Sequence, residues 1–230
     1  MVYLYQHHTM GICLMKKHNT IFFDLDGTLT DPGIGITNSV AHAYRHYGMD
    51  VPERHELYKF IGPPLVWSFM TYCGFTESKA KEAVEVYREY FHDRGLFENE
   101  LYKGIPELLS ELKKSGRHLV LATSKPDVFS VRILEHFDLA KYFEFVAAAT
   151  MNETRTNKHD IIEYAIESLN ITDRSQIVMV GDREHDAIGA KKSGVASIGV
   201  LYGYGSRQEL KNAGADMIAA SVEELKQILL

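Results

Sequence analysis

Cysteine is scarce in this chain of 230 residues, with Cys13 and Cys73 as its two cysteines. Two cysteines give no disulfide framework, so we expect reduced thiols in a cytoplasmic protein. No hydrophobic run has the length of a transmembrane helix, which argues against a membrane protein. The formal net charge of −6 and the pI near 6.0 argue against a nucleic-acid polymer as partner, because phosphate contacts need concentrated positive charge.

The first residues of the chain do not resemble a secretion signal. The basic pair Lys16-Lys17 follows the apolar stretch, whereas a signal sequence has its basic residues first. Met15 stands directly before this pair and before the first strong strand pattern, so it is a second candidate start. We therefore expect residues 1–18 to form an N-terminal extension, and residues 1–14 to be dispensable for activity.

The second half of the chain alternates between strand patterns and helix patterns. Pro106 near the start of one helical pattern and Gly116 beyond its end fit the usual helix boundaries, and Ser221 with Glu224 matches a capping box. This alternation predicts an α/β fold, a doubly wound Rossmann-like parallel sheet with helices on both faces. Strands are expected at 118–122, 145–149, 177–180, 196–201 and 216–219, and helices at 107–114, within 126–143, and at 159–169, 185–193, 207–212 and 221–230.

One connection in this pattern is much longer than a parallel sheet needs. Roughly ninety residues separate Leu29 from Leu119, whereas a crossover between parallel strands takes about 30. Three apolar stripes at helical spacing fill the interval. We therefore expect a core domain of residues 19–32 and 102–230, interrupted by a helical domain of residues 33–101. The stripes are Ile36, Val40, Ala43, Tyr44 and Tyr47; Leu65, Val66, Phe69, Met70 and Cys73; and Ala80, Val84, Tyr87 and Phe91.

Two aspartates follow the first hydrophobic strand. Asp24 and Asp26 are one residue apart, and Gly27 then allows the chain to turn. This arrangement offers a nucleophile, a proton-transfer group and oxygen ligands for a hard cation such as Mg²⁺. The alternative is an acidic turn at the end of a strand. The sequence D-x-D-G-T-L directly after the apolar residues Ile21 to Phe23 is the more specific pattern, and it favours a functional site.

Polar residues also follow later predicted strands. Thr123 and Ser124 end one apolar run, where a hydroxyl can bind a phosphoryl oxygen or cap a turn. Lys158 stands at a helix start, a position that disfavours a cation unless carboxylates or a phosphate face it. Asp182 and Asp186 flank a turn between a strand and a helix, where either could be a helix cap. Ligands on such a sheet bind at the carboxyl ends of its strands.

In this order the motifs resemble those of the haloacid dehalogenase superfamily, over about residues 19 to 230. The resemblance implies that Asp24 is the nucleophile and Asp26 the general acid and base. Thr123 and Lys158 would contact the phosphoryl group, with Ser124 beside them. Mg²⁺ would be the cofactor, held by Asp24, Asp182 and the backbone carbonyl of Asp26, with Asp186 acting through water or by orienting Lys158. The inserted helices resemble a type-1 cap.

The loop Lys59 to Leu65 resembles cap loops of phosphoglycolate phosphatases and of a 5'-nucleotidase-like group. It contains Gly62 followed by two prolines, which make a stiff connection between helices. The resemblance implies a phosphatase for a small phosphomonoester, of the phosphoglycolate or nucleoside 5'-monophosphate type, with Gly62 near the substrate. An ordinary interhelical turn is the alternative for this loop. The partner is expected to be this small molecule, and the chain a monomer or homodimer.

Two other functions stay open at this point. A phosphosugar mutase on the same scaffold would use the same four motifs and return the phosphate to its substrate. A non-catalytic phospho-aspartate signalling module would also combine a parallel sheet, acidic residues, a hydroxyl and a lysine. Asp26 distinguishes the latter, because a signalling module needs no acid for a leaving group.

Overall fold

A computed structural model describes residues 18–152 and 154–230 of the chain. These residues form two compact units. The core unit contains residues 18–29 and Tyr102–Leu230, and the insert unit contains Thr30–Leu101. The insert unit therefore interrupts the core unit shortly after its first strand. The predicted extension, residues 1–18, lies outside the described residues except for His18.

A six-stranded parallel sheet forms the centre of the core unit, in the order β5-β4-β1-β6-β7-β8. Strand β1 lies in the middle, where Phe23 is opposite Leu121 of β4 and Val180 of β6. All four residues of β1 are buried, as expected for a strand that is covered on both faces. The predicted α/β fold is confirmed. The strands are β1 (Thr20–Phe23), β4 (His118–Pro126), β5 (Phe145–Ala149), β6 (Ile177–Gly181), β7 (Ala196–Val200) and β8 (Met217–Ala219).

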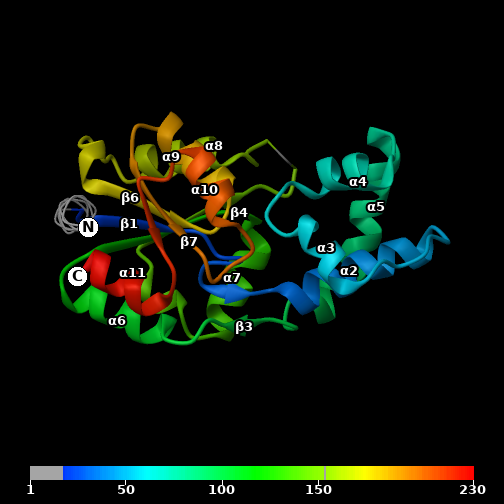
Figure 1. Ribbon diagram of the computed structural model, residues 1–230, viewed down its shortest axis with the longest axis horizontal. Helices are drawn as coiled ribbons and strands as arrows, with labels where there is room; N and C mark the ends of the chain where they lie inside the picture. The colour runs from blue at the N-terminus through cyan, green and yellow to red at the C-terminus, as the bar shows by residue number, and fades with distance from the viewer. Residues whose placement is uncertain (1–17, 153) are drawn as a thin grey trace. The chain divides into compact units, whose positions relative to one another are not determined.

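Helices cover both faces of this sheet (Figure 1). On one face, α8 and α9 pack on the strands and α10 packs on α9. On the other face, α6 packs on β4 and α11 packs on α6, while α7 contacts β4 and β5. The core beneath α8 is apolar and closed, with Phe22, Ile162 and Met179 fully buried. The helices are α6 (Ile105–Lys114), α7 (Asp127–His136), α8 (Lys158–Ser168), α9 (Glu184–Lys192), α10 (Arg207–Ala213) and α11 (Val222–Leu229).

Two details of the core unit differ from the sequence prediction. Strand β4 continues to Pro126, four residues beyond its predicted end, because Pro126 still pairs with Ala149 after an irregularity that begins at Thr123. At the start of α11, Ser221 accepts a hydrogen bond from the Glu224 amide as predicted. The Glu224 carboxylate, however, accepts from the Ala220 amide at 2.7 Å, one residue earlier than in the predicted capping box.

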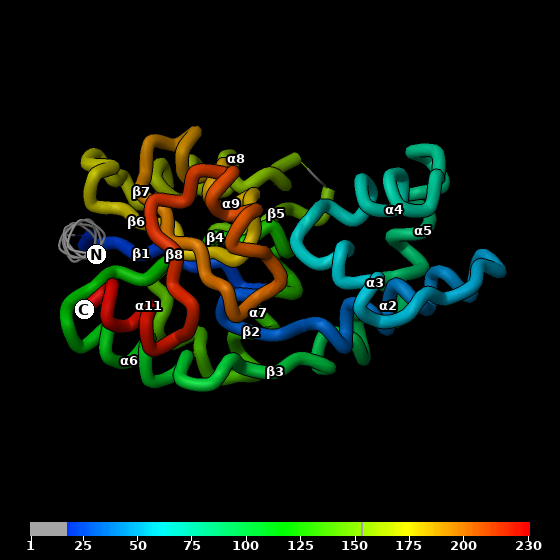
Figure 2. The backbone as a smooth tube through the Cα atoms, in the orientation of Figure 1, coloured from blue at the N-terminus to red at the C-terminus, as the bar shows by residue number. Residues whose placement is uncertain are grey.

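Helices make up most of the insert unit, and Figure 2 shows the path of its chain. Its two ends pair as short antiparallel strands, β2 (Thr30–Asp31) and β3 (Glu100–Leu101), which the sequence analysis did not predict. A strand of two residues is too short to show the alternation of apolar and polar residues by which a strand is predicted from sequence. The helices are α2 (Gly33–His46), α3 (Arg54–Leu57), α4 (Leu65–Cys73) and α5 (Glu77–Tyr90), with a 3₁₀ turn (Tyr58–Phe60) and a π-helical turn (Phe91–Gly95).

The three predicted apolar stripes of this unit have different environments. The stripe that begins at Ala80 on α5 and ends at Phe91 is buried along its length. The stripe that begins at Ile36 on α2 is buried as well, except for the half-buried Tyr47 directly after the helix. On α4, Phe69 is buried, but Met70 is 39% exposed and Leu65 and Val66 are half-buried. The apolar stripe on α4 is therefore only partly buried. Trp67, the single tryptophan of the chain, also lies on α4 and is 50% exposed.

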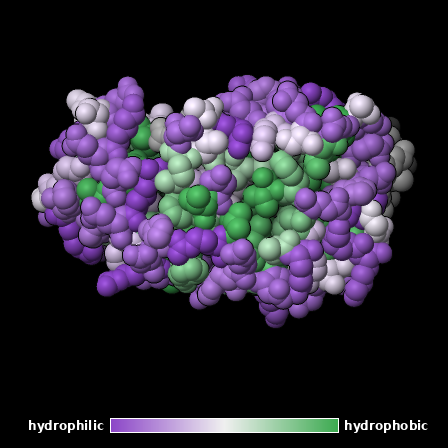
Figure 3. All heavy atoms as spheres, turned by 180° about the vertical axis from the view of Figure 1, so that it is seen from behind, coloured by the Kyte–Doolittle hydropathy of each residue, from purple (hydrophilic) through white to green (hydrophobic). Residues whose placement is uncertain are grey.

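Some large apolar side chains of the core unit reach the surface. Val128 and Val131 are three residues apart on α7, so they lie on the same side of that helix, and both are exposed. Figure 3 shows one face of the molecule, on which hydrophobic side chains gather among hydrophilic ones. Across residues 18–152 and 154–230, no helix is both long and apolar enough to cross a bilayer.

The closed core beneath α8 leads to a stability prediction. Ile162→Ala would leave a cavity in this core, and we expect it to lower the free energy of unfolding by about 2 to 5 kcal/mol. The matched control is Ile188→Ala on α9, where the side chain is 37% exposed, and we expect about 0.5 kcal/mol or less. Urea titrations followed by circular dichroism would measure both. Equal losses for the two variants would contradict the described packing.

Candidate active site

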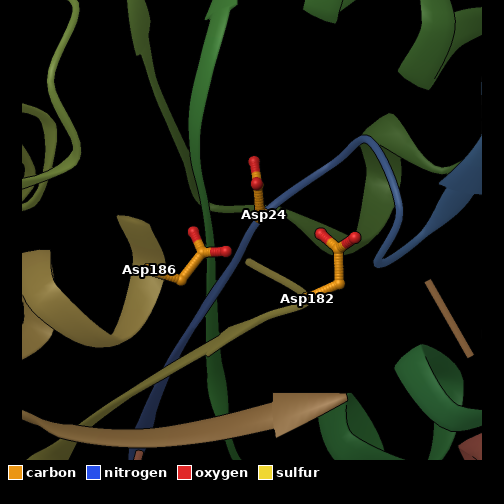
Figure 4. Close-up of side chains that lie close together, drawn as sticks. All are labelled: Asp24, Asp182 and Asp186. Carbon is orange, nitrogen blue, oxygen red and sulfur yellow. The ribbon is translucent and has the colours of Figure 1, made fainter. Parts of the chain in front are cut away.

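Three aspartates from separate parts of the chain converge at the carboxyl end of the sheet (Figure 4). Asp24 follows β1, Asp182 follows β6, and Asp186 lies in the first turn of α9. Their nearest carboxylate oxygens all lie within 4.8 Å of one another, and all three residues are buried. The strands β1 and β6 are parallel neighbours, so their carboxyl ends meet at this point. The sheet therefore brings together residues that are far apart in sequence.

Lys158 lies between two of these carboxylates. Its Nζ is 3.0 Å from Asp24 Oδ1 and 2.9 Å from Asp186 Oδ1, and it donates to the Ala122 carbonyl at 2.9 Å. Burial by itself would lower the pKa of Lys158, but the charges of Asp186 and Asp24 outweigh it and raise that pKa. Lys158 is therefore a buried ammonium group that connects the residue after β1, the middle of β4 and the first turn of α9.

Asp182 is fully buried and is held from two sides. Its Oδ2 accepts a hydrogen bond from the Tyr204 amide at 2.8 Å, and its Oδ1 accepts from Thr28 Oγ1 at 3.5 Å. Burial, together with the charge of Asp186, raises the pKa of Asp182 well above its usual range. Bringing this carboxylate into its ionised state therefore calls for positive charge nearby.

The three carboxylates fit a small hard cation. Magnesium takes oxygen ligands at about 2.1 Å in octahedral geometry, which places neighbouring ligand oxygens roughly 3 to 4 Å apart. The observed limit of 4.8 Å between the oxygens of Asp24, Asp182 and Asp186 is close to this spacing. The Asp26 side chain is outside this group of three, so any metal contact by Asp26 rests on the predicted backbone carbonyl.

A second buried ion pair lies at the same end of the sheet. Lys125 Nζ donates to Asp26 Oδ2 at 2.6 Å, and the two side chains are 6% and 14% exposed. Asp26 Oδ1 is also buried and accepts no hydrogen bond from any residue in the described part of the chain. Burial raises the pKa of Asp26, although the charge of Lys125 acts in the opposite direction. Sequence reasoning did not assign Lys125 to the site.

The remaining predicted site residues have different placements. Thr123 is buried in β4, and its Oγ1 accepts a hydrogen bond from the Lys125 amide at 3.3 Å. Ser124 follows it and is half-buried. Gly62 belongs to the insert unit and has a positive φ of 104°. The roles of Thr123, Ser124 and Gly62 in substrate binding stay predictions.

A turn after β7 contacts Asp182 and the loop after β1. This turn was not predicted from the sequence to be part of the site. The Tyr202 hydroxyl donates to the Thr28 carbonyl at 3.1 Å, and the Tyr204 amide holds Asp182. Between them, a Cβ on Gly203 would lie 2.2 Å from the Gly27 carbonyl oxygen. The sequence Gly203-Tyr204-Gly205 is a visible signal for such a close approach, because glycine lets two backbones pack together.

Comparison with known proteins assigns the family. The profile of the haloacid dehalogenase-like hydrolases matches residues 21–200, more than half of the chain. The chain belongs to this family. The membership confirms the superfamily expected from the sequence. Relatives named as a 5'-nucleotidase and as phosphatases confirm the expected phosphatase class.

Several relatives of this haloacid dehalogenase-like hydrolase match along most of its length. A 5'-nucleotidase of Pseudomonas aeruginosa is 44% identical over 213 residues, which cover 93% of this chain and 96% of the relative. The tyrosine-protein kinase PtkA of Mycobacterium tuberculosis is 37% identical, covering 91% of this chain and 72% of the relative. A solved structure of a predicted phosphatase from Clostridium acetobutylicum has a TM-score of 0.89 and 51% identity, covering 91% and 97% of the two chains.

The contact between Gly27 and Asp182 leads to a second prediction. Gly27 has a φ of +77°, and a Cβ there would lie 2.2 Å from Asp182 Oδ2. Gly116 has a similar φ of +82° in the same unit, with nothing within 4 Å of a Cβ. We expect Gly116→Ala to lower the free energy of unfolding by about 1 to 2 kcal/mol through backbone strain alone. Gly27→Ala should lower it by roughly 1 to 3 kcal/mol more through the clash.

Thermal or urea unfolding of both glycine variants would measure this difference. If Gly27→Ala were no less stable than Gly116→Ala, the close approach of Gly27 to the Asp182 carboxylate would be contradicted.

Proposed function

We propose that this phosphatase is a Mg²⁺-dependent phosphomonoester hydrolase that works through an aspartyl-phosphate on Asp24. The observation that carries the proposal is the convergence of Asp24, Asp182, Asp186 and Lys158 at one strand end. A second carboxylate, Asp26, lies two residues from Asp24 and is held by Lys125. This combination supplies a nucleophile, a separate proton-transfer group and fixed positive charge.

The metal would be held by Asp24, Asp182 and the backbone carbonyl of Asp26. Bound there, Mg²⁺ would supply positive charge that offsets the phosphoryl oxygens and the carboxylates. Asp186 would act mainly on Lys158, because its Oδ1 is 2.9 Å from Lys158 Nζ. The Tyr204 amide and Thr28 hydroxyl would keep Asp182 in place for the cation.

In the first step, an Asp24 carboxylate oxygen attacks phosphorus and the bond from phosphorus to the leaving oxygen breaks. Lys158, already 3.0 Å from Asp24, places its charge beside the nucleophile and the phosphoryl group. The Thr123 hydroxyl and the backbone amides near Leu25 and Asp26 would bind phosphoryl oxygens. Phosphoryl transfer depends mainly on such positioning and charge stabilisation.

Asp26 would carry the proton in both steps. It first donates a proton to the leaving oxygen, which departs as an alcohol. It then takes a proton from the water that attacks phosphorus, and the bond between phosphorus and the Asp24 oxygen breaks to release phosphate. Burial raises the pKa of Asp26, which favours its protonated form before the first step.

We propose a nucleoside 5'-monophosphate as the first substrate to test, because the 5'-nucleotidase relative is 44% identical over nearly its whole length. Phosphoglycolate is the second, since a phosphoglycolate phosphatase is also a relative, and the loop around Gly62 resembles the cap loops of both groups. Both are small phosphomonoesters. The insert unit, with Gly62, is proposed as the part that selects between them.

Other phosphoryl-transfer functions predict different products. A phosphosugar mutase would isomerise a sugar phosphate without releasing phosphate, and a signalling module would retain a long-lived phosphate on Asp24. One relative is named tyrosine-protein kinase PtkA. Its name suggests a third alternative, in which the phosphoryl group is transferred to a tyrosine hydroxyl. Free phosphate as the main product separates hydrolysis from all three. A cytoplasmic location and a monomeric or homodimeric state remain predictions from the sequence.

Replacement of the nucleophile is the direct test of this proposal. We expect Asp24→Asn to reduce phosphate release by at least about 1,000-fold, because an amide cannot form the acyl-phosphate. The control is Asp173→Asn, an exposed residue that caps a 3₁₀ turn far along the sequence, with activity expected to stay at the wild-type level. A panel of phosphorylated metabolites should be assayed for free phosphate. Undiminished release by Asp24→Asn would refute the assigned nucleophile.

Removal of the metal gives an independent test. We expect a chelator to abolish phosphate release and added Mg²⁺ to restore it, because the buried carboxylates need a compensating cation. Asp182→Asn should need at least about tenfold more Mg²⁺ for half-maximal activity, since it removes one anionic ligand. Titration of Mg²⁺ against activity, with Asp173→Asn as control, would measure this shift. Full activity in excess chelator would contradict the metal site.

A further inference from the structure

We infer that Lys125 is the positioning residue of the general acid: it holds one carboxylate oxygen of Asp26 and leaves the other to exchange the proton. This inference deepens the proposed function and rests on it. It starts from a buried ion pair in which Lys125 Nζ donates to Asp26 Oδ2 at 2.6 Å. The other oxygen, Oδ1, is buried and accepts no hydrogen bond within the described residues.

The backbone around Lys125 fixes where its side chain starts. Its amide donates to Thr123 Oγ1 at 3.3 Å, and its carbonyl accepts from Ser130 Oγ at 3.3 Å. The strand pairing shifts between Thr123 and Pro126, so Lys125 lies in an irregular part of β4 beside the predicted phosphate-binding hydroxyl. Irregularities of this kind often redirect a side chain next to an active site.

Stability alone gives a weak reason for this ion pair. Taking both charges out of water costs about as much as their attraction returns, so a buried pair is poor evidence of a stabilising role. The side chains of Lys125 and Asp26 are 6% and 14% exposed, hence nearly all of that cost applies. A role in orienting Asp26 explains why the pair lies at the acidic group.

The chemistry assigns different tasks to the two oxygens. With Oδ2 held by the Lys125 ammonium, rotation of the carboxyl group is restricted and the proton resides on Oδ1. During the first step, that proton passes from Asp26 Oδ1 to the leaving oxygen as its bond to phosphorus breaks. A positioned acid contributes most when the leaving group is a poor one, such as the 5'-oxygen of a nucleoside. A nitrophenolate leaves without a proton and needs no such help.

Lys125→Met tests this assignment, because methionine keeps the length and apolar stem of the side chain but has no ammonium group. The measurement is the first-turnover burst of leaving-group release, which reports only the phosphoryl-transfer step. We expect the burst with a nucleoside 5'-monophosphate to slow by about 100-fold or more, and that with p-nitrophenyl phosphate by about threefold or less. Lys226→Met is the control, since it removes another lysine of the core unit, which pairs with Glu111 near the surface.

A double variant keeps the test decisive if Lys125→Met is poorly folded. Lys125→Met with Asp26→Asn removes both charges together, so no buried carboxylate is left without its partner. If Lys125 acts through Asp26, this double variant should show the same burst rates as Asp26→Asn alone, because the effects are not additive. Circular dichroism would show which variants are folded.

Equal slowing with both substrates would overturn the inference, because Lys125 would then act on the phosphoryl group or on the fold. A double variant that is slower than Asp26→Asn would overturn it as well. Failure of the proposed function would look different from failure of this inference, because the wild type itself would then show no burst with either substrate. A wild-type burst that survives unchanged in Lys125→Met with the nucleotide would refute only the role of Lys125.

Discussion

The structure depends on one electrostatic constraint: several carboxylates are buried side by side at the end of a sheet. Asp24, Asp182 and Asp186 approach within 4.8 Å, and like charges this close repel strongly in a medium of low dielectric constant. Lys158 compensates part of this repulsion by contacting Asp24 and Asp186 together. Burial, together with the charge of Asp186, raises the pKa of Asp182. The same excess of negative charge that opposes folding makes the group receptive to a cation.

The fold solves the geometric part of this problem through strand order. Because β1 lies between β4 and β6, the residues that follow these strands meet without any long loop. Lys158 begins α8 and so stands at the helix end that disfavours a cation, yet its ammonium group lies among carboxylates and the Ala122 carbonyl. The local preference of the helix is therefore outweighed by contacts that only the assembled sheet provides.

Local sequence patterns predicted the sheet, most of its helices and the residues at its strand ends, because those signals lie within ten or so neighbouring positions. Long-range pairing was not predictable in the same way. Lys125 reads as an ordinary charged residue until β4 is seen to continue to Pro126 and place it against Asp26. The hold of the Tyr204 amide on Asp182 likewise depends on a backbone group, which no side-chain pattern can indicate. On α4, the apolar spacing identified one face of the helix, but it could not show whether other elements cover that face. Met70, which belongs to that face, is exposed.

The pairing of β2 with β3 has a consequence for how this architecture can diversify. Thr30 lies opposite Leu101, so the two chain ends of the insert unit are joined at their base. The entropic cost of closing such an inserted segment grows only slowly with its length. A longer or shorter insert therefore requires no change in the central sheet. The insert unit can thus vary in length and surface independently of the strands that carry the buried carboxylates. Sequence changes confined to this inserted module would leave the buried carboxylates at the strand ends unaltered.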